Sequence, residues 1–124
     1  MGLLGRTCAW EEAYFRATGR AAEASRRRAR GPVAVPVCGL DVPTFYHSVA
    51  DVGAVLGPGF RRDARLGLAV LVPPPYLEAR WRRLPRVVRT VVAAVDRGIA
   101  AWPPANRLGD HVLVRWSRQR YADG

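Results

Sequence analysis

The chain has 124 residues, of which 49% are apolar and 24% are charged, and this balance is ordinary for a single globular domain. No apolar run approaches the ~20 residues that a membrane-spanning helix needs, so the sequence predicts no membrane span. Only two cysteines are present, which excludes a disulfide framework and makes a cytoplasmic location the default expectation.

The net charge is +10, and all twenty basic residues are arginine. Arginine contacts phosphates and base edges, so a small nucleic-acid-binding protein is one interpretation. The other is a base composition that favours Arg, Ala, Gly, Val and Pro codons, since the arginines are spread from Arg6 to Arg120 and only Arg26–Arg30 is dense. We favour the second, because net charge bears on solubility and non-specific binding rather than on fold.

The start of the chain predicts a helix with one aromatic face. Thr7 is a candidate N-cap, and two glutamates in the first turn suit the positive end of a helix. Trp10 and Tyr14 are four residues apart, with Phe15 beside them. Core packing and contact with a ligand are both open as roles for this face. Residues 20–30 predict a second helical segment, which a Gly-Pro pair ends.

A hairpin and a third helix are predicted next. Valines alternate with other residues over residues 33–46, on either side of the turn glycine Gly39, and prolines restrict both arms to edge-like pairing. Ser48 and Asp51 have the spacing of a capping box, with aspartate in place of glutamate. The helix that Ser48 begins is expected to end at the glycines and proline of residues 57–59.

The apolar run from Leu66 to Val72 is the stretch around which the rest of the chain is expected to pack. It has no polar alternation, which predicts a strand buried on both faces. The three prolines Pro73–Pro75 cannot donate to a sheet ladder and are expected to end the strand. The preceding helix, the glycine turn and this strand form an αβ unit, so the predicted fold class is α/β.

A further helix is predicted to enter through Pro85. Its apolar stripe follows the helical period and is expected to pack on a pair of adjacent antiparallel strands, Leu66–Val72 and Val112–Trp116. The stripe comprises Leu84, Val88, Val91, Val92, Val95, Ile99 and Trp102. One buried strand and one half-buried strand cannot close a core alone, because each leaves an edge and an apolar face open.

The reactive side chains do not form a self-contained active site. Residues 57–59 follow a helix and precede a strand, the reverse of a dinucleotide-binding loop. His47 could act as a general base, although a capping or surface role is favoured at a helix start. Asp110 and His111 should point to opposite faces of a strand. Cys8 lies near a helix start, which lowers a thiol pKa, but no partner base is identifiable, and no spacing predicts a metal site.

Four motifs carry, by their order and spacing, a resemblance to a known family. They are Tyr46-His47-Ser48, Gly59-Phe60, LGLAVLVPPPYLE over residues 66–78, and Leu108-Gly109-Asp110-His111. With TCAWEEAYF and AAEASRRRARGPVAVPV, they resemble the carboxy-terminal half of bacterial class I S-adenosylmethionine-dependent methyltransferases. The most similar type acts on small molecules, as the ubiquinone and menaquinone biosynthesis methyltransferases do.

The resemblance implies part of a seven-stranded Rossmann-like sheet whose last two strands are antiparallel. Met1–Gly5 would be the end of the fifth strand, Arg65–Val72 the sixth, and Val112–Trp116 the seventh, inserted between the other two. Residues 1–46 would comprise the end of a strand and a helical and hairpin insertion for substrate recognition, and residues 47–124 the carboxy-terminal αβαβ part. Helices on both faces of such a sheet would account for the apolar run.

The resemblance also implies a function, methyl transfer to a small molecule. The insertion and the strand ends line the substrate cleft in this family, so the implied substrate-binding residues are Trp10, Tyr14, Tyr46, His47 and Tyr76. Simple packing is the alternative for each of them. No catalytic residue and no particular methyl acceptor are assigned.

The family binds S-adenosylmethionine with its first four strands, which have no counterpart in this sequence. No cofactor is therefore expected on this chain alone, and we expect it to be inactive by itself, as a truncated product or one whose start is placed too late. The expected partners are the small-molecule substrate of full-length relatives, a chain that supplies the missing half, or a second copy. A small basic nucleic-acid-binding or interaction protein is the alternative function, and nucleic acid is the less expected partner.

Overall fold

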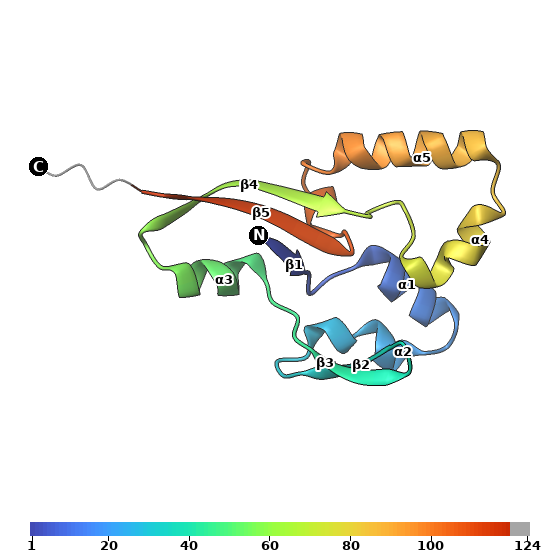
Figure 1. Cartoon of the computed structure of the whole chain (residues 1–124), viewed down its shortest axis with the longest axis horizontal. Helices are drawn as coiled ribbons and strands as arrows, with labels where there is room; N and C mark the ends of the chain where they lie inside the picture. The colour runs from blue at the N-terminus through green and yellow to red at the C-terminus, as the bar shows by residue number, and fades with distance from the viewer. Residues whose placement is uncertain (120–124) are drawn as a thin grey trace, which may run out of the picture.

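The computed structural model describes residues 1–119 as a mixed α/β fold with five strands in two antiparallel sheets (Figure 1). No helix in this part of the chain has the length and apolar character needed to cross a bilayer. The strands are β1 (Gly2–Leu4), β2 (Val33–Val37), β3 (Leu40–Thr44), β4 (Phe60–Leu68) and β5 (His111–Arg118). The α-helices are α1 (Ala9–Ala17), α2 (Ala21–Ala24), α3 (Val49–Leu56), α4 (Glu78–Arg82) and α5 (Arg86–Ile99), with 3-10 turns η1 (Arg26–Arg28), η2 (Pro75–Leu77) and η3 (Ala105–Arg107).

The long strand β5 lies between β1 and β4 and runs antiparallel to both. Leu3 of β1 pairs with Val112, and Leu66 of β4 pairs with Leu113. The predicted antiparallel pairing of the apolar run with the last strand is confirmed for residues 66–68 of the run. Because β1 and β4 both run against β5, they are parallel to each other and their carboxyl ends lie at the same edge of the sheet (Figure 1).

The apolar run from Leu66 to Val72 does not form a strand over its whole length, so the predicted bounds of this strand are wrong. β4 begins earlier, at Phe60, and ends at Leu68. Its polar first half pairs with the end of β5, because a long partner strand offers hydrogen bonds whatever the side chains are. Ala69 has a φ of 54°, a left-handed conformation that turns the chain out of the sheet before the prolines.

Helix α3 covers one face of the three-stranded sheet. The cluster beneath it comprises Val49, Val112 and Val114, with Leu3 and Trp116 packed against them. A Cβ at Gly53 would lie 2.9 Å from a Trp116 ring carbon, so glycine is what allows this close approach. The predicted capping box is confirmed, since Ser48 and Asp51 each accept a hydrogen bond from the other's backbone N–H.

The opposite face of the sheet is open. Leu66, Leu68 and Leu113 share this face and are 37%, 39% and 39% exposed. The prediction of a strand buried on both faces is therefore wrong for residues 1–119. The sheet buries only the side that α3 covers, and this leaves an apolar surface on the other side.

Helix α5 forms over the predicted residues, but its apolar stripe faces solvent rather than the strand pair. Val88, Val91 and Val95 of this stripe are 42%, 55% and 47% exposed, whereas Asp96, outside the stripe, is buried. The Asp96 carboxylate accepts a hydrogen bond of 2.6 Å from the backbone N–H of Leu71. This contact with the loop after β4 turns the polar side of α5 inward, and the predicted packing of the stripe is wrong.

The amino-terminal segment differs from prediction at two points. Cys8, not Thr7, occupies the N-cap of α1, because the Thr7 hydroxyl donates instead to the Arg107 carbonyl at 2.6 Å. Residues 20–30 form only α2 and the turn η1 rather than one helix. The predicted hairpin is confirmed as β2–β3, with Gly39 at its turn in the left-handed region at a φ of 83°.

Candidate functional site

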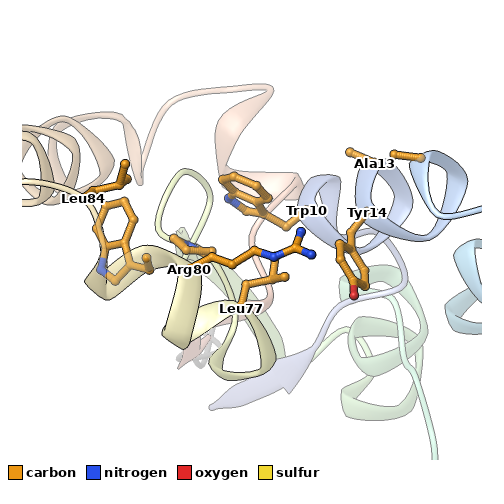
Figure 2. A pocket seen from close by; sticks show the side chains of 9 residues that line it. Trp10, Ala13, Tyr14, Leu77, Arg80 and Leu84 are labelled. Carbon is orange, nitrogen blue, oxygen red and sulfur yellow. The ribbon is translucent and has the colours of Figure 1, made fainter.

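An apolar cleft of about 430 Å³ lies between α1 and the segment from η2 to α4 (Figure 2). Its walls are aromatic and aliphatic, with one charged side chain. The lining residues are Trp10, Ala13, Tyr14, Ala17, Pro73, Leu77, Arg80, Trp81 and Leu84. Figure 2 shows the guanidinium of Arg80 reaching toward the space between Trp10 and Tyr14.

The cleft is built from the segments that follow β1 and β4. Helix α1 comes after β1, and the loop with Leu71 and Pro73 comes after β4. The indole N–H of Trp10 donates a hydrogen bond of 2.9 Å to the carbonyl of Leu71, which holds the two segments together. Ligands of open α/β sheets commonly bind just beyond the carboxyl ends of parallel strands, and this cleft has that position.

The chemistry of the lining favours binding over catalysis. Among the lining residues, only Tyr14, Trp10 and Trp81 add polar side-chain groups to the positive charge of Arg80, and the Trp10 N–H is already bonded. Aromatic walls accept a planar apolar ligand through large contact area. An exposed guanidinium at the rim favours an anionic group on that ligand, with an attraction that solvent screens.

Tyr76 packs beside the cleft, against the far side of the Tyr14 ring. The two ring centroids are 5.7 Å apart, and Phe15 stacks on Tyr76 at 6.2 Å. Burial raises the pKa of Tyr76 above its usual value, and the charge of Glu11 adds to this, so the hydroxyl is protonated at neutral pH. The structure therefore brings together three of the five predicted substrate-binding residues, Trp10, Tyr14 and Tyr76.

Tyr46 and His47 lie apart from these three. The Tyr46 ring is buried, and the Arg27 guanidinium lies 5.2 Å from its centroid in a cation–π contact. His47 is exposed at the start of α3 and stacks on Phe45, with ring centroids 6.3 Å apart. Neither residue lines the aromatic cleft.

A buried ion network lies on another face of α1. Glu11 accepts a hydrogen bond of 2.8 Å from Nε of Arg27 and a second from Arg26. Arg27 also pairs with Asp110 and donates to the carbonyl of Gly5 at 3.3 Å. Burial alone would lower the pKa of Arg27, but its hydrogen bond to Glu11 and the nearby negative charges outweigh burial and raise it. The network therefore stays charged and joins α1 and η1 to the strand edge.

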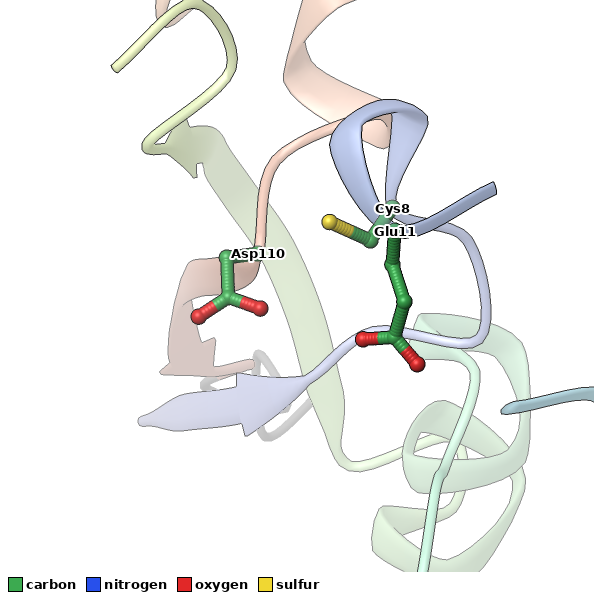
Figure 3. A group of neighbouring side chains, drawn as sticks. All are labelled: Cys8, Glu11 and Asp110. Carbon is green, nitrogen blue, oxygen red and sulfur yellow. The ribbon is translucent and has the colours of Figure 1, made fainter. Parts of the chain in front are cut away.

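Cys8 adds a thiol to the two carboxylates of this network. A thiol and two carboxylates together could hold a metal ion. The ligand atoms of Cys8, Glu11 and Asp110 all lie within 4.8 Å of one another (Figure 3). Both carboxylates already bind guanidinium groups, and two positive charges balance the two negative ones. Burial raises the pKa of Cys8, contrary to the lowering expected near a helix start, so the thiol is protonated. We interpret the group as a scaffold for α1.

Asp110 and His111 are in contact, which corrects the prediction that they point to opposite faces. His111 Nδ1 lies 3.0 Å from an Asp110 carboxylate oxygen. Strand alternation does not reach Asp110, because β5 begins at His111. Asp110 also pairs with Arg27, so this contact extends the ion network rather than forming an independent dyad.

Compared with known proteins, the chain matches no family model, no curated protein and no solved structure. The sequence analysis did not predict the second wall of the cleft, which includes Leu77, Trp81 and Leu84. These three residues are spaced four and three apart, which is the spacing of one apolar helix face. This pattern could have predicted that they line a common surface.

The dense arginine cluster is largely paired with carboxylates. Arg26 and Arg27 bind Glu11, and Arg28 binds Glu12 at 2.6 Å. Side chains engaged in this way are less free to contact a phosphate backbone. The geometry of the cluster therefore gives little support to nucleic-acid binding.

Proposed function

We propose that residues 1–119 form the acceptor-binding part of a class I S-adenosylmethionine-dependent methyltransferase that acts on a small apolar molecule. The observation that carries the proposal is the place of β5, between β1 and β4 and antiparallel to both. The resemblance implies this arrangement for the fifth, seventh and sixth strands of the family's sheet. An antiparallel strand inserted between two parallel ones is a specific topology, so it adds weight to the sequence motifs.

The aromatic cleft is the proposed acceptor site. It lies beyond the carboxyl ends of β1 and β4, and it contains Trp10 and Tyr14 from the segment that resembles the family's substrate insertion. A planar acceptor would lie between these rings, and Arg80 would attract an anionic substituent. The cofactor would be held by strands other than those of residues 1–119, because no glycine-rich loop follows a strand within that range.

Filling the cleft should weaken binding of a planar aromatic acid. The probe is 1-hydroxy-2-naphthoate, followed by quenching of tryptophan fluorescence. Ala13 lines the cleft, so Ala13→Trp should weaken binding by about tenfold or more through lost contact area. Ala54→Trp places the same ring on the exposed side of α3, outside the cleft, and should leave the affinity unchanged.

Arg80→Gln separates charge recognition from apolar contact. It should weaken naphthoate binding by about two- to fivefold, as expected for an exposed charge, and leave the uncharged 1-naphthol unaffected. Equal affinities in wild type, Ala13→Trp and Ala54→Trp would mean that the cleft is not a binding site. The proposed function would then have no acceptor site.

A further inference from the structure

A second cavity, of about 280 Å³, lies on the α3 side of the sheet and differs in character from the aromatic cleft. Its floor is apolar and includes Leu3, Val49 and Val112. Its walls carry Arg6, Arg62, Arg65, Arg107 and His47, which come from the β1–α1 loop, β4, η3 and the entry to α3. Segments far apart in the chain thus contribute four arginines to the lining of one small cavity. We call this cavity the arginine pocket.

Three of the four arginines of the pocket have no carboxylate partner among residues 1–119. Among residues 1–119, no carboxylate lies within ion-pair distance of Arg62, Arg65 or Arg107, whereas Arg6 has Asp51 at 3.9 Å. Burial lowers the pKa of Arg65, and the neighbouring charges of Arg107 and Arg62 lower it further. Like charges held together without a counter-ion cost free energy, and a bound anion would remove that cost.

Hydrogen-bond donors without an acceptor also lie around the pocket. Nε of Arg6 is buried and has no acceptor, which is uncommon for a buried polar atom. Val49 and Ala50 line the pocket from the first turn of α3, and their backbone N–H groups precede the first intrahelical bond, whereas the N–H of Asp51 donates to the Ser48 hydroxyl. Arg65 uses its Nε–H for the Asn106 carbonyl at 2.9 Å, which fixes the side chain while its terminal nitrogens remain available.

We infer that the arginine pocket binds a phosphate group of a small molecule. Guanidiniums pair with phosphate oxygens through parallel hydrogen bonds, and the start of a helix adds backbone donors to the same anion. A cavity of this size suits one or two phosphate groups better than a polynucleotide strand. The site is independent of the proposed methyl-acceptor cleft, since the two share no lining residue.

Equilibrium dialysis with radiolabelled inorganic pyrophosphate tests this inference. The method counts bound anion whether or not the chain associates with itself, and the ionic strength is held constant with sodium chloride. Wild type should bind one pyrophosphate per chain. Arg65→Gln and Arg107→Gln should each weaken binding by about tenfold or more, as expected for loss of a charge-assisted hydrogen bond. Arg86→Gln removes the same charge on exposed α5 and should change the affinity less than twofold.

A second measurement does not depend on the ligand. Without any anion, Arg107→Gln should melt at a higher temperature than wild type, because it relieves repulsion with Arg65, and Arg86→Gln should not. Absence of saturable pyrophosphate binding, or equal loss in Arg86→Gln and Arg107→Gln, would overturn the inference. Tighter binding of random duplex DNA than of pyrophosphate, weakened equally by all three substitutions, would also overturn it and would point to a diffuse basic surface.

Discussion

Replacing Arg27 with methionine should lower the free energy of unfolding by about 3–5 kcal/mol. Arg27 is buried and holds both Glu11 and Asp110, which are buried or nearly so. Methionine has similar length but no charge, so it would leave two carboxylates facing each other with only Arg26 to balance them. A small domain holds ~5–15 kcal/mol of stability, so this loss is a large share of the total.

Arg28 provides the matched control. It is the next residue, carries the same side chain, and pairs with Glu12 at the exposed surface. Arg28→Met should cost about 0–1 kcal/mol, because water screens a surface pair. Urea denaturation followed by tryptophan fluorescence measures both variants. Equal losses for Arg27→Met and Arg28→Met would show that the network contributes no more than a surface ion pair.

The purified chain should associate with itself, and added salt should strengthen the association. Leu66, Leu68 and Leu113 form an exposed apolar surface on the open face of the sheet, and such surfaces mark partner contacts or aggregation. The net charge of +10 opposes association by repulsion between chains. Salt screens this repulsion to a range of ~8 Å at physiological ionic strength, so only the apolar attraction would remain.

Light scattering across a salt series measures this effect. Leu68→Thr with Leu113→Thr should raise the salt concentration at which association begins, because both residues belong to the open face. Leu40→Thr is the control, since Leu40 is exposed at the start of β3 in the hairpin, away from that sheet. A monodisperse monomer at every salt concentration would mean that the open face does not drive association. No partner would then be needed to cover it.

Local signals in the sequence predicted the elements of this fold better than their packing. The capping box at Ser48, the hairpin around Gly39 and the helix after Pro85 each depend on neighbouring residues, and all three are present. The bounds of β4 depend on β5, a strand far along the chain, and hydrophobicity alone misplaced them. The inward face of α5 includes Asp96, which accepts a hydrogen bond from the Leu71 N–H, and no periodicity could reveal this contact.

The candidate site was predictable in part for the same reason. Trp10 and Tyr14 share a helix face, so their proximity followed from spacing. Arg27 reaches Asp110 across most of the chain, and nothing local marks either residue as a partner. The arginine pocket likewise joins residues from four segments, and in the sequence its members looked like any others in an arginine-rich chain.

Calorimetric titration with S-adenosylmethionine tests the proposed function most directly. It is carried out on the purified chain alone and on the chain co-expressed with the amino-terminal half of a full-length class I methyltransferase. We expect no binding by the chain alone, and a one-to-one complex of the two halves that binds the cofactor. A low micromolar dissociation constant for the chain alone, or the absence of any complex between the two halves, would contradict it.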